Sequence, residues 1–558
     1  MCLTRKFLTA AIIPALVLTL AASFTPSARA NVYATNIKLN GSLTNTTSGL
    51  GSPVNISFIL NEQATLGTTI NILSGSTVLR SISIPFGDNG TLSGLNTVAW
   101  DGKDNGGSFV PLGTYVVSIT AATSGYTDWT QTSTDFNDGY YVFAPRGIAV
   151  NNNSNSPYYG RVFVGNATQN SAGSQPGDVD GILKANADGS LADEGQTNGG
   201  YNWIDDGFSD SPHFLRYGQD DRIYALDLTG TGVIVALNQT MSTNQVVLTL
   251  NNYANNPFKD NLFAGWGMFD VTDAGTPQGR LWLGDYDSPG GAGLWAWHMV
   301  NGVADPNDHI GQHVIAVGGD LDVAASGGSM MDAHSNIFIG QDITDGGALP
   351  NRAMVFTNWN GASTLTSGTA WSVGGNDDTF LGNYDLAIDS RAHPKYVALC
   401  LSSSGGLRVL NAADGSIVTN GAQVLNNLDG GNNYYGVAWD AVGNLYGAIN
   451  NPDLNNKWRV FSPPGTNQAT TVAVATVQIT APSTGPFIIS VGISGTTITI
   501  PFIASPSDVA SAFTLQSSST VIGIYTPVSG ANITAVGGGI FEATAPISGP
   551  MRFYRIKR

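Results

Sequence analysis

Four polar residues recur at one position of a repeated pattern, and they are the candidates for metal chemistry in this 558-residue chain. Each lies three residues after an aromatic residue at the centre of a short apolar run. In chain order they are Asn166, Asp227, Asp285 and Gln341. Carboxylate and amide oxygens are the ligands that calcium and other hard cations prefer. If the runs are neighbouring strands, we expect these oxygens to converge on a calcium ion that could polarise a bound substrate.

The same position can also be explained without a metal. In the last two copies of the pattern it is held by Leu399 and Ile449, which are not ligands. Asp and Asn that follow a strand are ordinary turn residues. The sequence contains no Gly-x-Ser-x-Gly motif, phosphate-binding loop or dinucleotide-binding fingerprint. The polar residues therefore indicate either a cation site or turn chemistry, and both interpretations stay open.

The elements that would position these residues repeat six times, and each copy has a short strand with a central aromatic residue. The separations between successive aromatics are 61, 58, 56, 58 and 50 residues. A period of this size is typical of stacked supersecondary units, and four-stranded propeller blades fit it best. We expect the aromatics to fill the core between blades. They are Phe163, Tyr224, Trp282, Phe338, Tyr396 and Tyr446.

The strands of this region resemble those of NHL-type and related six-bladed propellers. The matching pieces include Gly147-Ile148-Ala149-Val150, Gly160-Arg161-Val162-Phe163-Val164 and Asn444-Leu445-Tyr446. The resemblance implies a six-bladed β-propeller over residues 145–463, with longer loops than the family has. Six-bladed lactonases and related hydrolases, which use a cation at the channel mouth, are the precedent for chemistry at the four polar residues.

The segment before the repeats has alternating apolar residues and carries a turn motif. Trp100-Asp101-Gly102 is followed by Pro111-Leu112-Gly113-Thr114-Tyr115, and we expect Trp100 to pack against the strand that begins at Thr114. This motif resembles the immunoglobulin-like domain of the flagellar hook-capping family. The resemblance implies an Ig-like β-sandwich over residues 31–125 that serves as a spacer or interaction module, without a flagellar role. Residues 126–144 are predicted to be a linker.

The segment after the repeats is predicted to be a linker over 464–480 that is part strand, followed by a second β-sandwich over 481–558. It contains Ala512-Phe513-Thr514-Leu515-Gln516-Ser517-Ser518 and ends with Arg552-Phe553-Tyr554-Arg555-Ile556-Lys557. These two pieces resemble C-terminal modules of secreted proteins from some environmental bacteria, for which surface attachment, export sorting and spacing are all open roles. The predicted strands are Ile488–Val491, Thr496–Ile500, Phe513–Gln516, Val521–Tyr525 and Arg552–Ile556.

The first 30 residues have the pattern of a secretory signal peptide. Arg5-Lys6 precedes an apolar run, and Ala28-Arg29-Ala30 ends it. We therefore expect export to the extracellular space or the cell surface. No other run reaches the roughly 18 apolar residues that span a bilayer, so no membrane span is predicted. Cys400 would be the one cysteine left, which predicts a buried thiol and no intramolecular disulfide.

The net charge of the chain is −17, and removal of the first 30 residues, which carry a charge of +3, makes it −20. Such a chain is expected to repel nucleic acids and anionic membranes. Scarce charges, many Gly and Asn turns and short alternating runs predict an all-β protein. Five tryptophans in or beside the long inter-strand segments could stack on sugars or fill blade interfaces. They are Trp203, Trp266, Trp295, Trp297 and Trp371.

Three functions are consistent with these observations. The first is a secreted interaction protein whose propeller presents a face to a glycan or protein at the cell surface. The second is a secreted propeller hydrolase or lyase that uses a hard cation, and the third is a structural matrix or appendage component. The side chains that line the central channel distinguish them, because a site needs convergent polar groups that are not already paired with each other.

Overall fold

The chain folds entirely into β-strands, turns and two single-turn 3₁₀ helices, η2 (Asp138–Tyr140) and η8 (Ala510–Ala512), in the part described by a computed structural model. The all-β prediction is confirmed. No helix in this part is long and apolar enough to cross a membrane. The structure describes residues 32–558 apart from 136–137, 169–180, 194–198, 204–210, 228–232, 250–267, 286–292, 306, 308–310, 322–326, 342–351, 375–383, 402–404, 451–456, 482–484, 506, 538, 548 and 550–551.

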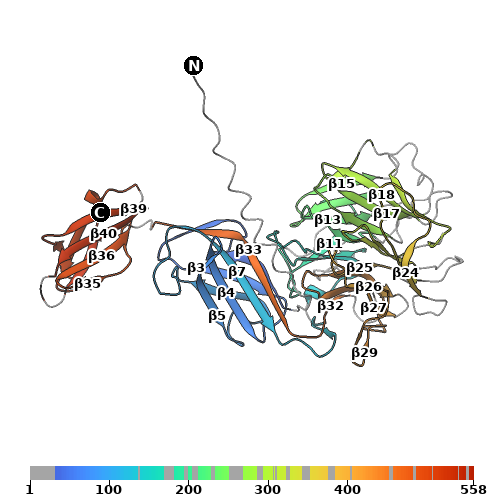
Figure 1. Ribbon diagram of the computed structural model, residues 1–558, viewed down its shortest axis with the longest axis horizontal. Coiled ribbons are helices and arrows are strands. Elements are labelled where there is room, and N and C mark those ends of the chain that lie inside the picture. The colour runs from blue at the N-terminus through green and yellow to red at the C-terminus, as the bar shows by residue number, and fades with distance from the viewer. Residues whose placement is uncertain are drawn as a thin grey trace, which may run out of the picture.

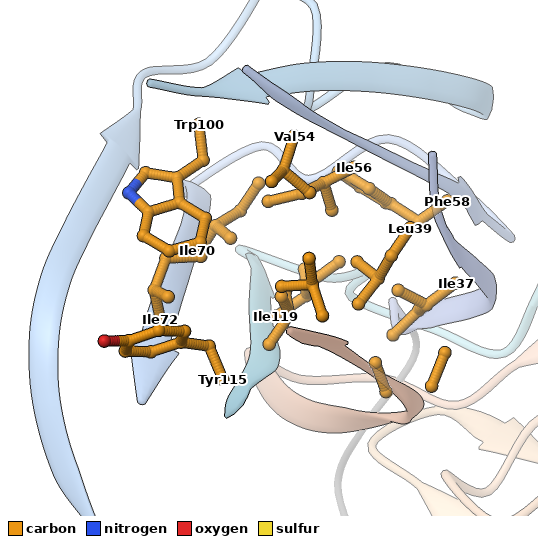
Figure 2. Packing of buried hydrophobic residues seen from close by; sticks show 14 of the residues in the cluster. Ile37, Leu39, Val54, Ile56, Phe58, Ile70, Ile72, Trp100, Tyr115 and Ile119 are labelled. Carbon is orange, nitrogen blue, oxygen red and sulfur yellow. The ribbon is translucent and has the colours of Figure 1, made fainter. Parts of the chain in front are cut away.

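The first β-sandwich has two sheets that share one apolar core (Figure 2). Trp100 and Tyr115 meet edge to face at 5.6 Å inside it, as the turn motif predicted. One sheet has the order β1 (Ala34–Leu39), β3 (Val54–Leu60), β6 (Gly94–Trp100). The other has the order β2 (Thr46–Gly49), β33 (Asn467–Thr480), β7 (Gly113–Thr123), β4 (Gly67–Ser74), β5 (Thr77–Ile84).

The strand β33 corrects one predicted boundary. Residues 467–480 were expected to be part strand within a linker between domains, but all of them form one 14-residue strand of the first sandwich, between β2 and β7. Ala473, Ala475, Val477 and Ile479 point into the first core. The sandwich is therefore completed by residues on both sides of the propeller, which is inserted between β7 and β33 (Figure 1). The two crossings run together, since Gly465 N donates to Tyr126 O at 2.9 Å.

Six antiparallel sheets follow β7 in the described chain, and we number them as blades 1 to 6 in chain order. In each blade the second strand carries one of the six aligned aromatics. The first three blades are β9 (Pro145–Val150), β10 (Val162–Asn166), β11 (Gly181–Ala185); β12 (Leu215–Tyr217), β13 (Arg222–Asp227), β14 (Val233–Asn238), β15 (Asn244–Thr249); and β16 (Phe269–Thr272), β17 (Arg280–Asp285), β18 (Gly293–Val300), with β19 (Val303–Ala304) and β20 (Gln312–Ala316) both paired to β18.

The second half of the ring repeats this arrangement. A short hairpin, β28 (Thr419–Asn420) and β29 (Gln423–Val424), follows blade 5. The blades are β21 (Ser329–Met331), β22 (Ile337–Gln341), β23 (Arg352–Phe356), β24 (Thr369–Gly374); β25 (Leu386–Ile388), β26 (Tyr396–Leu401), β27 (Gly406–Asn411); and β30 (Tyr434–Trp439), β31 (Leu445–Ile449), β32 (Lys457–Ser462) with β8 (Thr130–Gln131).

The blades pack through six separate apolar clusters, one for each interface between neighbours. Each aligned aromatic lies in or against the cluster that its blade shares with the next blade. Phe163 packs with blade 2, for example, and Tyr446 of blade 6 packs with blade 1. A lone sheet would leave one face in water, so the ring stabilises every blade by covering both faces. The predicted propeller is confirmed by this order of sheets.

Two contacts close the ring. The inner strand β30 of blade 6 packs against the inner strand β9 of blade 1. In addition, β8 pairs with β32 and supplies the outer strand of blade 6 from the N-terminal side. Residues 126–144 were predicted to be a linker, but they contain β8 and η2, and Trp129 and Tyr140 enter two blade cores. The final blade therefore depends on residues that precede the first one.

The inner strands approach each other closely at glycines. A Cβ on Gly147 of β9 would lie 2.5 Å from Leu215 N, and one on Gly436 of β30 would lie 2.4 Å from Arg146 O. These distances are shorter than any real Cβ contact, so side chains are excluded at both positions. The inner strands can therefore pack backbone to backbone around a narrow axis.

The second β-sandwich lies beyond the first, at the end of the molecule away from the propeller (Figure 1). Phe487 at its start contacts Phe109 of the first sandwich at 4.9 Å. Residues 521–525 were predicted to be a strand, but they form a turn between β37 and β38. One sheet has β34 (Phe487–Ile488) and β35 (Gly492–Ser494) on β36 (Thr497–Ile503), then β40 (Ile540–Pro546) and β39 (Asn532–Gly537); the other has the order β38 (Thr526–Pro527), β37 (Thr514–Ser518), β41 (Phe553–Lys557).

Candidate functional site

The predicted cation ligands lie at the ends of the second strands of their blades. Asn166, Asp227 and Gln341 are fully buried. Asn166 accepts from Ala144 N at 2.6 Å and donates from Nδ2 to Thr168 O at 3.0 Å. The Asp227 carboxylate accepts a hydrogen bond from the Tyr201 hydroxyl at 2.7 Å. These bonds tie the first two residues of the set to chain segments near their own blades.

The spacing from the aromatic explains this placement. Side chains alternate between the two faces of a strand, so a residue three positions after the aromatic points to the opposite face. The aromatic faces the next blade, and the later residue therefore faces the preceding one. Leu399 of blade 5 accordingly packs with Phe338 of blade 4, and Ile449 of blade 6 packs with Ala398 of blade 5.

The remaining parts of the calcium prediction lie partly outside the described residues. The backbone of Asp285 ends β17, opposite Gly293, while its side chain is not among those described. Asp287 and Asp342, which adjoin this set in the sequence and could contribute further oxygens, are also outside the described residues. Within the described chain, no group of three or more His, Cys, Asp or Glu side chains is arranged to hold a metal ion. A calcium site built from Asn166, Asp227, Asp285 and Gln341 stays a prediction.

The axis of the ring is crossed by a buried ion pair that sequence reasoning missed. Arg216 lies on the inner strand of blade 2, and Asp385 immediately precedes the inner strand of blade 5. Arg216 Nη2 donates to Asp385 Oδ1 at 2.6 Å, and Nη1 donates to Oδ2 at 3.3 Å. Blades 2 and 5 are opposite each other in a ring of six, so this contact, the axis pair, must pass across the centre.

The surroundings of the axis pair fix both partners. The Asp385 carboxylate also accepts from Leu386 N at 2.8 Å and from Val437 N of blade 6 at 3.2 Å. Burial acts to lower the pKa of Arg216, but the carboxylates of Asp385 and Asp270 more than offset it and the pKa is raised. Arg216 is therefore a permanent cation whose charge is neutralised inside the protein.

A second ion pair joins blades 3 and 5 over the inner strand of blade 4. Arg391 Nη1 donates to Asp270 Oδ2 at 2.9 Å, and Nη2 donates to Oδ1 at 2.5 Å. Met331 on β21 donates its backbone N–H to the same Asp270 carboxylate at 2.9 Å. Asp270 is buried and Arg391 is about one quarter exposed. The carboxylates of Asp385 and Asp270 are thus both paired with guanidinium groups.

Aromatic and cationic side chains stack where the inner strands of blades 1, 5 and 6 begin, and we name this group the mouth stack. The Tyr384 and Tyr435 rings lie parallel, 4.4 Å apart with an 8° angle between them. The Arg146 guanidinium carbon lies 4.5 Å from the centre of the Tyr435 ring. All three side chains are half-buried. The mouth stack therefore joins three blades and leaves part of each side chain accessible.

Four of the five tryptophans singled out in the sequence are described, and three of these are buried. Trp203, Trp295 and Trp297 are buried within blade-interface clusters. Trp371 is half-buried, and its indole N–H donates to Ala412 O at 2.9 Å. Trp266 is outside the described residues. Cys400 is fully buried, as predicted, and burial raises the pKa of its thiol.

Two buried carboxyl groups lie near the junction between the first sandwich and the propeller. Tyr126 donates to Glu62 Oε2 at 2.7 Å. Burial raises the pKa of Glu62 to about 7, although the Tyr126 bond opposes the shift. Burial also raises the pKa of Asp440 to about 6, against hydrogen bonds from Asn444, Val442 and Tyr446. The charge of Asp440 contributes to the raised pKa of Glu62, so the free energy of unfolding is expected to depend on the ionisation of these two groups.

Comparisons with known proteins give structural likenesses only. No family model and no curated protein matches the chain. The RRP9 WD40 repeats match at 10% identity with a TM-score of 0.36, over 62% of this chain and 99% of that one. A putative oxidoreductase (glucose dehydrogenase) from Thermus thermophilus matches at 13% identity with a TM-score of 0.35, over 60% and 99%. Sqt1 of Saccharomyces cerevisiae matches at 9% identity with a TM-score of 0.28, over 76% and 100%.

Proposed function

We propose that this chain is an exported binding protein, in which the propeller is a rigid scaffold that presents one face to a glycan or protein at the cell surface. The axis pair is the observation that carries the proposal. A catalytic or metal site at the axis needs polar groups that are free to meet a ligand. Arg216 and Asp385 instead bind each other across the centre, and Arg391 and Asp270 bind each other beside it.

The binding face is proposed at the end of the ring that carries the mouth stack. Tyrosine and arginine are enriched in protein interfaces, because each offers a large contact area together with hydrogen-bonding groups. Tyr384, Tyr435 and Arg146 come from three blades and hold each other in place. A ligand bound there would contact side chains that are already ordered, so binding would cost little conformational entropy.

The first sandwich is proposed to be an Ig-like module of the hook-capping type that holds the propeller at a fixed angle. The core that it shares with β33 supports this role, because the propeller is attached through both of its chain ends. Residues 1–30 are proposed to be a signal peptide that directs export.

Metal analysis of the mature chain, residues 31–558, tests the proposal against a cation-dependent hydrolase. We expect less than one calcium per chain after gel filtration, no calcium binding by calorimetry, and the same result for Asp227→Ala and Asp285→Ala. One calcium per chain that is lost in both variants would overturn the proposal. Such a result would support the hydrolase or lyase instead.

A further inference from the structure

The turn between β37 and β38 in the second sandwich presents apolar side chains almost entirely to solvent. Ile522 is 98% exposed, Ile524 is 89% exposed and Val521 is 62% exposed. We name residues 521–524 the apolar tip. A monomeric protein rarely leaves such side chains together in water without a use for them.

The apolar tip is held in one shape by its own contacts. The Tyr525 hydroxyl donates to Val521 O at 3.2 Å and closes the turn. Gly523 N donates to Thr520 O at 3.2 Å. The Arg555 guanidinium carbon lies 4.5 Å from the centre of the Tyr525 ring, and Arg555 Nε donates to Gln516 Oε1 at 2.9 Å. Because the turn is ordered in advance, little entropy is lost when its end is covered.

Two cationic side chains lie at the start of β41, beside the base of the apolar tip. Phe553 of β41 pairs with Ser518, the last residue of β37, so the start of β41 lies beside the turn. Arg552 and Arg555 are both exposed there. The two acidic side chains of residues 481–558 lie on other elements, Asp508 just before η8 and Glu542 on β40.

The charge of the second sandwich is opposite to that of the remaining chain. Residues 481–558 contain four basic and two acidic side chains, which gives 4 − 2 = +2. Residues 31–480 therefore carry −20 − 2 = −22. The sequence predicted repulsion from anionic membranes for the chain as a whole. Charges are screened beyond about 8 Å at physiological ionic strength, so a module at the end of the molecule can act differently from the rest.

We propose that the apolar tip docks this protein on an anionic lipid bilayer. Isoleucines at a convex tip can enter the acyl region of a bilayer, while Arg552 and Arg555 at its base meet lipid phosphates. Tyr525 lies between them, at the level where tyrosine is favoured in membrane interfaces. The acidic propeller stays on the water side of the docked module. This docking does not depend on what the propeller binds.

Vesicle flotation of residues 31–558 tests the proposal, with phosphatidylcholine vesicles that contain or lack phosphatidylglycerol. We expect the wild-type chain to float with the anionic vesicles, and more weakly at high salt. Replacing both isoleucines of the tip (Ile522→Ser with Ile524→Ser) should lower the affinity by about tenfold or more, since both side chains lose their apolar burial. Arg552→Gln with Arg555→Gln should remove the preference for phosphatidylglycerol and the salt dependence.

Ile493→Ser is the matched control, because Ile493 is 70% exposed in the same module but lies on β35 of the other sheet. It should leave vesicle binding unchanged within about twofold, as a surface substitution outside the contact does. The proposal is overturned if the wild-type chain does not float, or if the tip variant floats as well as the wild type. It is also overturned if sedimentation shows self-association that the tip variant abolishes while vesicle binding persists, because the tip would then bind a second copy of the chain.

Discussion

The propeller and the second sandwich differ in how many large apolar side chains they leave exposed to solvent. Among the described residues, the exposed valine, leucine, isoleucine and phenylalanine side chains of the propeller are Val246 and Val424. The much shorter second sandwich exposes eight. They are Val491, Ile493, Val509, Val521, Ile522, Ile524, Val536 and Ile547.

Geometry accounts for part of this difference. In a closed ring each sheet is covered on both faces by its neighbours, so apolar side chains of either face are buried. A two-layer sandwich covers only the inner face of each sheet. The outer face and the turns remain in water, and exposed isoleucines there are not required by the fold. We infer that the ring is optimised for rigidity, and that the second sandwich keeps surface apolar residues for contact with something else.

The largest effect is expected from shortening the chain so that the second sandwich is removed, either alone or together with β33. A chain that ends at residue 480 should keep the first sandwich and the propeller folded, because it retains β33. A chain that ends at residue 466 should lose the first sandwich, since Val477, Ile479 and the other inward residues of β33 are removed from its core. Thermal melting followed by circular dichroism, with limited proteolysis, would distinguish these outcomes. Equal stability of both truncated chains would show that β33 is dispensable.

The next largest effect concerns the inside of the ring. Arg216→Met leaves the Asp385 carboxylate buried without its guanidinium, and we expect a loss of about 3–5 kcal/mol in the free energy of unfolding. Urea unfolding of the propeller transition measures it. Arg558→Gln is the matched control in the second sandwich, where Arg558 is 58% exposed and pairs with Asp508. The Asp508 side chain is 5% exposed beneath it, but removal of the exposed guanidinium lets water reach that carboxylate, so the loss should stay below about 1 kcal/mol. Similar losses in both variants would show that the ion pair inside the ring contributes no more to stability than the pair at the surface of the second sandwich.

The junction between the first sandwich and the propeller should respond to pH. The folded state raises the pKa of Glu62 from 4.5 to about 7, so it favours the neutral carboxyl. In the folded state Glu62 stays neutral up to about pH 7, whereas in the unfolded state it ionises near pH 4.5. The stabilisation is therefore fully present below pH 4.5, and it should fall by about 3 kcal/mol in total as the pH rises from about 4.5 to about 7. Glu62→Gln should remove this part of the pH dependence. A pH profile of unfolding that is the same in wild type and variant would show that Glu62 titrates normally.

The smallest effect on stability is expected at the apolar tip. Ile522 has almost no contacts to lose, so Ile522→Ser should change the free energy of unfolding by less than about 0.5 kcal/mol. Phe502→Ala, in the core of the same module, should cost about 3–5 kcal/mol by leaving a cavity. Urea unfolding of both variants measures the difference. A large loss in Ile522→Ser would mean that the tip is structural.

The repeated pattern made much of the ring predictable. All six aligned aromatics lie on second strands, because burial between blades requires a large apolar side chain at the same place in every copy. Local alternation identified these strands because both of their neighbours are close in the sequence.

Pairing between distant segments was not predictable in this way. The strand β33 lies beside β7, about 350 residues earlier in the sequence. The strand β8 pairs with β32 of the last blade, although the sequence of all the other blades lies between them. The small residues of β33, interspersed with threonine, resemble those of a linker. Arg216 and Asp385 were missed because each is a single charge in an apolar run, 169 residues from the other. Opposite charges on inner strands three blades apart are the signal that could have paired them.

A double-mutant cycle on Arg216→Met and Asp385→Leu tests most directly whether the axis of the ring is closed by paired charges. We predict that the two single substitutions destabilise the propeller strongly and that the double variant recovers at least about 2 kcal/mol of the summed loss, as coupled neighbours do. If the two losses simply add to within about 0.5 kcal/mol, the residues do not interact. The axis would then be open to a ligand, and the proposal of a closed binding scaffold would be wrong.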